Sequence, residues 1–235
     1  MREDCQQRRA SAPRWRRHDL LHVTPDAWAR ALSRSPSAID LPLVRDWADR
    51  DWPVIVRRRD AAEESLLVPI GVPLPPQAGK RRVALLLQAD GVKRRSSPPL
   101  LDEAARAANP AWQSTIDALV ALGRRTGVEP RAFGSLLWQH LTGLTYLSPS
   151  SDIDLLWPVP ASFDISSLLF GIAEIQRHAP LRIDGEILFP DGSGVNWREL
   201  WSAHGAKDRA TVLAKTMEGV RLLDLNLLMG AEQVA

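Results

Sequence analysis

Residues 133–157 read FGSLLWQHLTGLTYLSPSSDIDLLW, and this stretch decides the fold that the sequence predicts. Gly134 and Ser135 follow a short apolar segment and precede a helix predicted over residues 136–141. A helix N-terminus that follows two small residues presents free backbone N–H groups, which suit an anionic phosphate. We therefore predict that Gly134 and Ser135 contact substrate phosphates. The plain alternative is that they form only a strand-to-helix turn.

The end of the stretch carries two carboxylates two positions apart. Residues 152–157 predict a strand, and alternate side chains of a strand face the same way, so Asp152 and Asp154 share one face. Two neighbouring carboxylates repel each other unless a cation lies between them, and Mg²⁺ prefers such oxygen ligands, with Mn²⁺ as a possible substitute. We predict that both residues bind metal, although Asp-x-Asp also occurs at exposed strand starts. Metal-binding carboxylates beside a phosphate-binding turn indicate phosphoryl or nucleotidyl transfer.

The same wording, FGSLLWQHLTGLTYL followed by SDIDLLW, resembles the Gly-Ser … Asp-x-Asp signature of the DNA polymerase beta-like nucleotidyltransferase superfamily. Within it, the chain is similar to one branch, the malonate decarboxylase holo-acyl-carrier-protein synthases, also called phosphoribosyl-dephospho-CoA transferases. The similarity extends from RRHDLLHV near the start to DGSGVNWREL. One departure is the Ser- and Pro-rich connector between Ser135 and Asp152, which is longer than usual for the superfamily.

The resemblance implies a specific reaction. The enzyme would take 2′-(5″-triphosphoribosyl)-3′-dephospho-CoA, attach its phosphoribosyl-dephospho-CoA group to a serine of the apo acyl carrier subunit of malonate decarboxylase, and release pyrophosphate. The residues alone indicate only metal-dependent transfer of the nucleotidyl type. Two rivals are a catalytically inert binding protein of the same fold, and an enzyme that uses ATP on a small molecule or RNA.

A third carboxylate usually completes a two-metal site, and the strand predicted over residues 181–189 offers two candidates. Asp184 and Glu186 lie two positions apart and so share a face. The resemblance favours the shorter side chain, so we predict that Asp184 is a shared metal ligand or the base that deprotonates the acceptor hydroxyl. Alternatively, Asp184 and Gly185 form a hairpin turn or a bulge.

The charge is divided unevenly along the 235 residues. Residues 1–100 hold 19 Lys and Arg against 12 Asp and Glu, whereas residues 101–235 hold 11 against 16. A basic first half and an acidic second half suggest that one collects polyanions while the other holds metal. RNA would require a basic groove across the second half, so we expect no nucleic-acid partner.

Three further groups of cations are candidates for binding substrate. Arg57 and Arg58, in a run that includes Arg59, and the run at residues 93–95 could bind phosphates of the CoA-like moiety; each could equally be a solvated strand end or loop. Lys215 lies among apolar residues and could face the leaving pyrophosphate, or could merely extend its amine to solvent.

The pattern of elements predicts an α+β protein, with a small mixed N-terminal domain followed by a nucleotidyltransferase-like domain. We expect a disordered tail at 1–14, a basic domain at 15–98 that binds substrate or carrier, and a catalytic domain at 99–235. The predicted helices are 25–32, 43–48, 101–107, 112–125, 163–178 with Ser162 as its cap, and 197–204. The predicted strands are 52–59, 66–72, 82–88, 131–134 and a hairpin over 210–224.

The sequence lacks features of export. No apolar run approaches the ~20 residues that a membrane span requires, and the N-terminus has no apolar signal core. Cys5 is the one cysteine, so neither an internal disulfide nor a cysteine-based zinc site is available. We therefore expect a cytoplasmic enzyme with no membrane partner.

Overall fold

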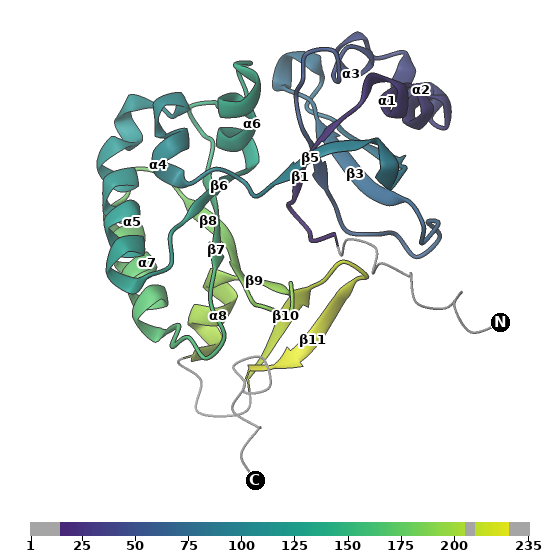
Figure 1. The fold of residues 1–235 in the computed structure, drawn as a ribbon. Coiled ribbons are helices and arrows are strands. Elements are labelled where there is room, and N and C mark those ends of the chain that lie inside the picture. The colour runs from purple at the N-terminus through teal and green to yellow at the C-terminus, as the bar shows by residue number, and fades with distance from the viewer. Residues whose placement is uncertain (1–14, 205–209, 226–235) are drawn as a thin grey trace, which may run out of the picture.

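The computed structural model describes residues 15–204 and 210–225 and divides them between two lobes (Figure 1). The predicted tail at 1–14 lies outside the described residues. The first lobe ends with strand β5 (Val92–Ser96), and the second begins with helix α4 (Leu101–Ala104). The short connection between them contains Pro98 and Pro99, which cannot donate backbone hydrogen bonds and so separate the two sheets.

The first domain is an antiparallel sheet with helices packed on it. Its five strands lie in the order β4-β3-β2-β1-β5. Its first helix begins at Pro25, as predicted, because the Thr24 hydroxyl accepts a hydrogen bond from the Ala27 N–H at 3.2 Å. The other elements are β1 (Leu20–Val23), β2 (Val54–Val56), β3 (Val68–Pro73) and β4 (Arg82–Leu87), with helices α1 (Pro25–Ser33), α2 (Pro36–Ile39) and α3 (Pro42–Arg45) and 3-10 turns η1 (Pro76–Ala78) and η2 (Ala89–Gly91).

The second domain is a mixed sheet in the order β11-β10-β9-β8-β7-β6. Strands β7 and β8 run parallel and are joined by helix α7, whereas the other neighbours are antiparallel. The strands are β6 (Arg131–Phe133), β7 (Ile153–Pro158), β8 (Ile183–Leu188), β9 (Gly194–Asn196), β10 (Thr211–Lys215) and β11 (Val220–Asp224). The helices after α4 are η3 (Ala105–Ala107), η4 (Pro110–Trp112), α5 (Gln113–Thr126), α6 (Gly134–Thr142), α7 (Ser166–His178) and α8 (Trp197–His204).

The α+β class and most predicted elements are confirmed, including the hairpin of β10 and β11. Helix α7 begins later than predicted, so Ser162 as its cap is wrong: Ser162 has a φ of +61° outside the helix, and Asp164 instead accepts a hydrogen bond from the Ser166 N–H. The hairpin alternative for Asp184 and Gly185 is also wrong, because β8 runs unbroken through both residues.

The two domains share one hydrophobic core cluster. Leu137, Trp138 and Tyr146 belong to the second domain but are buried among side chains of the first. The Trp138 ring packs edge-on against Trp47 with 5.9 Å between centroids, and the Tyr146 hydroxyl donates a 2.9 Å hydrogen bond to the Pro73 carbonyl. Because α6 carries Leu137 and Trp138, and Tyr146 follows shortly after it, the first domain holds the helix whose N-terminus was predicted to bind phosphate.

No helix in the described part of the chain combines the length and the apolar character that crossing a bilayer requires.

Candidate active site

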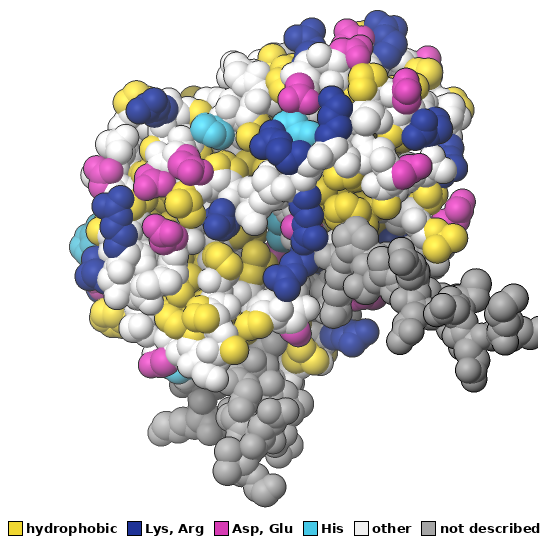
Figure 2. Space-filling view, viewed as in Figure 1, with side chains coloured by type: hydrophobic (Ala, Val, Ile, Leu, Met, Phe, Trp, Pro, Cys, Tyr) yellow, Lys and Arg dark blue, Asp and Glu magenta, His cyan; other side chains and the backbone are white. Residues whose placement is uncertain are grey.

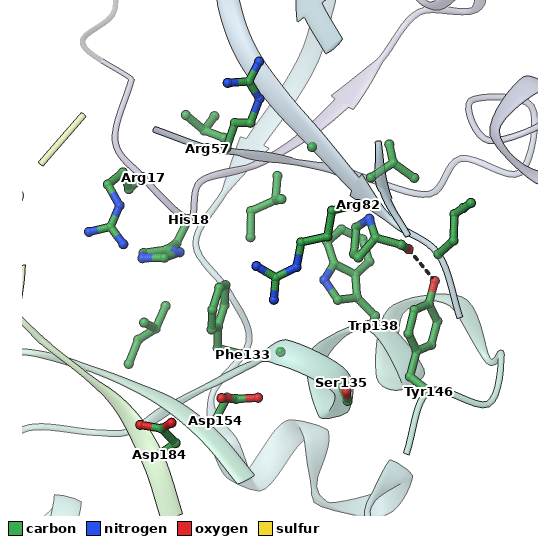
Figure 3. A pocket seen from close by; sticks show the side chains of 18 of the residues that line it. Arg17, His18, Arg57, Arg82, Phe133, Ser135, Trp138, Tyr146, Asp154 and Asp184 are labelled. Atoms are coloured by element: carbon green, nitrogen blue, oxygen red, sulfur yellow. Dashed lines mark hydrogen bonds between the residues drawn. The ribbon is translucent and has the colours of Figure 1, made fainter. Parts of the chain in front are cut away.

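A cavity of about 510 Å³ lies between the domains and is lined by residues of both (Figure 3). Its second-domain wall contains Gly134 and Ser135 at the start of α6, Asp154 on β7 and Asp184 on β8. Its first-domain wall comes from β2, β3 and the start of β4, and it carries the cations Arg57, Lys80, Arg81 and Arg82. On the face shown in Figure 2, Lys and Arg side chains gather where the two lobes meet.

Asp154 is a half-buried carboxylate without a neutralising partner. No hydrogen bond or ion pair reaches its carboxylate from any described residue. Burial, together with the charges of Asp184 and Asp152, raises the pKa of Asp154 to about 6, although the charges of Arg82 and Arg182 oppose that shift. A carboxylate in this state is suited to a cation, and the role of Asp154 as a metal ligand stays a prediction.

Gly134 lets the helix come close to that carboxylate. Its φ of +58° falls in the left-handed region, and a Cβ at this position would lie 1.9 Å from Asp154 Oδ2. The helix begins two residues earlier than predicted, so Gly134 and Ser135 form its first turn. Backbone N–H groups in a first turn have no acceptor within the helix. The cavity therefore brings a carboxylate together with the helix end that was predicted to bind phosphate.

Asp184 lies beside Asp154 in the parallel register of β7 and β8. Its Oδ1 accepts hydrogen bonds of 2.8 Å from both the Gly185 N–H and the Asn196 side-chain amide, which fix the direction of the carboxylate. Asn196, at the end of β9, also lines the cavity. Sequence reasoning missed Asn196; the available signal was a polar residue between the buried Val195 and Trp197.

Asp152 does not line the cavity, unlike Asp154, with which it was predicted to bind metal. Strand β7 begins one residue after Asp152. Arg182 lies between two acids: its Nε is 3.8 Å from Asp152 Oδ2 and its Nη2 is 3.5 Å from Asp184 Oδ2. Asp152 is thus close enough to affect Asp154 but holds its own cation, and its role as a metal ligand stays a prediction.

Glu186 is surrounded by cations. Arg17 Nη2 lies 2.9 Å from one carboxylate oxygen, Lys215 Nζ lies 2.8 Å from the other, and His18 Nε2 lies at 3.4 Å. Burial opposes ionisation of Glu186, but the hydrogen bond from His18 and the charge of Arg17 outweigh it and hold the pKa well below its usual range. Burial lowers the pKa of His18. Lys215 is therefore occupied by Glu186, although it does line the cavity.

The two arginines that were predicted to bind substrate differ in their positions relative to the cavity. Arg57 lines the cavity, but both of its terminal nitrogens contact the Glu63 carboxylate, and Asp60 lies 3.5 Å away. Arg58 is exposed and outside the lining. The cations that sequence reasoning did not single out, at residues 80–82, do face the cavity. Nothing in the sequence indicated that residues 80–82, rather than the other two basic runs, would face the cavity.

Protein side chains alone do not complete a metal site. Within residues 15–204 and 210–225, no group of three or more His, Cys, Asp or Glu side chains could hold a metal ion. Mg²⁺ commonly binds through one or two carboxylates and takes its other ligands from water and substrate phosphates. The pair of Asp154 and Asp184 fits that smaller donor set.

An acidic wall with a helix N-terminus, facing a basic wall across one cavity, is the arrangement of a transferase that acts on phosphorylated substrates. Comparisons with known proteins then place the chain. The family model described as "Phosphoribosyl-dephospho-CoA transferase MdcG C-terminal domain" matches residues 99–226, and the corresponding N-terminal domain model matches residues 16–98. The chain belongs to the phosphoribosyl-dephospho-CoA transferase family and is therefore an enzyme.

Curated relatives carry the same description over most of their length. A phosphoribosyl-dephospho-CoA transferase of Bradyrhizobium diazoefficiens is 43% identical over 88% of this chain and 89% of its own. One from Xanthomonas campestris pv. campestris is 39% identical over 88% and 93%, and one from Pseudomonas aeruginosa is 34% identical over 74% and 78%. No solved structure matches the chain.

Proposed function

We propose that this chain transfers the phosphoribosyl-dephospho-CoA group from its triphosphate precursor to a serine of the apo acyl carrier subunit of malonate decarboxylase, with release of pyrophosphate. The unpartnered carboxylate of Asp154, facing the first turn of α6, is the observation that carries this proposal. Membership of the family supplies the substrate and the carrier. The pairing of a Gly-Ser helix start with acids on β7 and β8 also supports placing the second domain among the polymerase beta-like nucleotidyltransferases.

The donor set supports a divalent metal ion in this reaction. Asp154 and Asp184, with Asp152 beside them, offer hard oxygen ligands, and burial and the two neighbouring carboxylates raise the pKa of Asp154. Bound Mg²⁺ or Mn²⁺ would neutralise negative charge on the substrate's phosphates. Asp152 is the weakest candidate of the three, because it precedes β7 and does not line the cavity.

The chain's own groups account for the remaining steps. The N–H groups in the first turn of α6, at Gly134 and Ser135, bind phosphate oxygens. Asp184 is held by Asn196 and Gly185, so its second oxygen can orient the serine hydroxyl or accept its proton. The domain interface at Trp138 keeps the two walls of the cavity in register.

The test is direct. The full chain, Mg²⁺, the triphosphoribosyl precursor and the apo carrier subunit are incubated, and the carrier is weighed by mass spectrometry. We expect a mass increase equal to one phosphoribosyl-dephospho-CoA group, together with one pyrophosphate released per carrier. A carrier of unchanged mass, under conditions in which the chain is folded and metal is present, would refute the proposal.

A further inference from the structure

The first domain carries three basic runs, and they differ in what surrounds them. In the run at 57–59, Arg57 pairs with Glu63, and Arg59 donates to two backbone carbonyls, those of Glu64 and Leu67. These arginines therefore stabilise the loop that follows β2. The donor groups of Arg57 and Arg59 are already engaged before any substrate arrives, and Arg58 lies outside the cavity lining.

The run on the edge strand β5 is compensated in the same way. Lys93 lies 3.7 Å from Asp51, Arg94 is hydrogen-bonded to His22 at 2.7 Å, and Arg95 pairs with Asp19 at 2.8 Å. None of the three lines the cavity. Cations on an edge strand also keep it from pairing with other chains, which accounts for this run without a ligand.

The run at Lys80, Arg81 and Arg82 has no such partners. It runs from the turn after η1 into the first residue of β4, and all three side chains line the cavity while remaining exposed. Among the described residues, no carboxylate or carbonyl forms an ion pair or side-chain hydrogen bond with any of them. Three adjacent cations that face a cavity without counter-charges repel one another and favour an anion with several negative oxygens.

Arg82 extends from the first domain toward the acidic wall (Figure 3). Figure 3 shows its guanidinium extending from the first domain toward Phe133, with the Asp154 carboxylate beyond. Its charge is close enough to act on Asp154 but does not form an ion pair with it. The space between Arg82 and Asp154 is thus bounded by a cation on one side and by a carboxylate and a helix N-terminus on the other.

We propose that Lys80, Arg81 and Arg82 bind the triphosphate of the substrate from the first-domain side, with Arg82 placed against the pyrophosphate that departs. A guanidinium can contact two phosphate oxygens at once. Because Arg82 has no ion-pair partner among the described residues, the phosphate does not have to displace a carboxylate. The triphosphate, rather than the diphosphate of the CoA arm, binds here. Arg82 faces the acidic wall of Asp154 and Asp184, and the phosphorus–oxygen bond that breaks lies beside the same two acids. This inference rests on the proposed function for the identity of the substrate.

The proposed chemical step gives the charged side chains Asp184 and Arg82 separate roles. The serine oxygen forms a bond to the innermost phosphorus of the triphosphate, and the bond from that phosphorus to the bridging oxygen breaks. The electron pair leaves with pyrophosphate, and the serine proton passes to a base, for which Asp184 is the candidate. Arg82 then offsets charge that grows on the leaving oxygen, so its effect is stronger in the transition state than in the bound substrate.

Binding of inorganic tripolyphosphate to the full chain in the presence of Mg²⁺ tests the site without the carrier. We expect Arg82→Gln to weaken this binding roughly 10- to 100-fold, and the double variant Lys80→Gln/Arg81→Gln to weaken it less. The matched control is Arg45→Gln, which removes one exposed cation of the same domain outside the cavity and should leave the affinity unchanged. Equal affinity in Arg82→Gln and Arg45→Gln would overturn the proposal.

A second probe separates the two possible sources of phosphate. Dephospho-CoA carries the diphosphate of the CoA arm without the triphosphate, so its affinity should be the same in Arg82→Gln and the parent chain. If Arg82→Gln weakens dephospho-CoA and spares tripolyphosphate, the run serves the CoA arm and the proposal is wrong. In the transfer assay, Arg82→Gln should lower kcat more than it raises KM for the precursor, and Arg82→Lys should restore part of kcat.

The inference and the proposed function can fail separately. A parent chain that binds tripolyphosphate through Arg82 but never modifies the carrier would keep the anion site and refute the reaction. A parent chain that modifies the carrier, with an Arg82→Gln variant of unchanged kcat and KM, would keep the reaction and refute the assignment of Arg82.

Discussion

Asp154 and Glu186 lie on the neighbouring parallel strands β7 and β8 and line the same cavity, yet their surroundings are opposite. Glu186 has three cationic or imidazole partners within 3.4 Å, and its pKa is held well below its usual range. Asp154 has none among the described residues, and burial raises its pKa to about 6. Glu186 is therefore a structural group that joins the domains, whereas Asp154 is the proposed metal ligand.

The largest effect expected from this comparison is on transfer itself. Asp154→Asn should reduce the rate at least about 1,000-fold, because it removes a metal-binding charge worth several kcal/mol in the transition state. Asp184→Ala should lose at least about 100-fold, as expected of a ligand or base. Steady-state transfer at ordinary Mg²⁺ concentration measures both. Turnover close to that of the parent chain in Asp154→Asn would remove the metal assignment.

The next effect concerns stability and falls on the other carboxylate. Glu186→Gln should lower the free energy of unfolding by about 3 kcal/mol, since it leaves Arg17 and Lys215 partly buried without their partner. Chemical denaturation measures the loss. The control is Glu174→Gln, which breaks exposed contacts with Arg177 and His178 and should cost no more than about 1 kcal/mol. Equal losses in the two variants would contradict a structural role for Glu186.

A third effect appears as pH dependence in the metal-free protein. The folded pKa of Asp154 is raised, so its stabilising contribution is complete below about pH 4 and is lost as pH rises through about 6. The shift from 3.8 corresponds to at most about 3 kcal/mol. The stability of Asp154→Asn relative to the parent chain should therefore rise between pH 5 and 8 in EDTA. Glu186 adds little slope there, because both its depressed folded pKa and its ordinary value of 4.5 lie below that window.

One result of this pH series would contradict the predicted pH dependence of Asp154. If denaturation curves of the parent chain and Asp154→Asn differ by the same free energy from pH 5 to pH 8, the Asp154 carboxylate is not the uncompensated group that its surroundings indicate.

The smallest effect is expected at Arg57, the cavity-lining arginine that already has a partner. Because Glu63 compensates its charge, Arg57→Gln should raise KM for the precursor no more than about threefold and leave kcat unchanged. Arg82→Gln, measured in parallel, supplies the contrast. An Arg57→Gln effect larger than that of Arg82→Gln would show that pairing in the structure is a poor guide to which cation binds substrate.

Local pattern was enough to predict most of the second domain. The strand containing Asp154, the helix after Ser135 and the hairpin that ends the described chain all follow from hydrophobic periodicity and turn residues. Strands β1 and β5 were not predicted. The central residues of β5 are three consecutive cations on an exposed edge, so the strand lacks the apolar alternation that marks a half-buried one.

The candidate site was predictable only in part, because its charges are compensated by residues far away in sequence. Glu186 and Arg17 are 169 residues apart, and no spacing rule could show that they pair. The same holds for Asn196 and Asp184, which meet only when β9 joins β8. The three basic runs look alike in the sequence, and tertiary contacts alone distinguish the paired runs from the one at residues 80–82.

Crystals of the full chain grown with Mn²⁺ and inorganic tripolyphosphate would test the central claim most directly, through the anomalous signal of the metal. We predict a peak within coordination distance of Asp154 and close to the Asp184 carboxylate, with Glu186 still bound to Arg17 and Lys215. A peak beside Glu186, or strong Mn²⁺ occupancy in Asp154→Asn at the same place, would contradict the account.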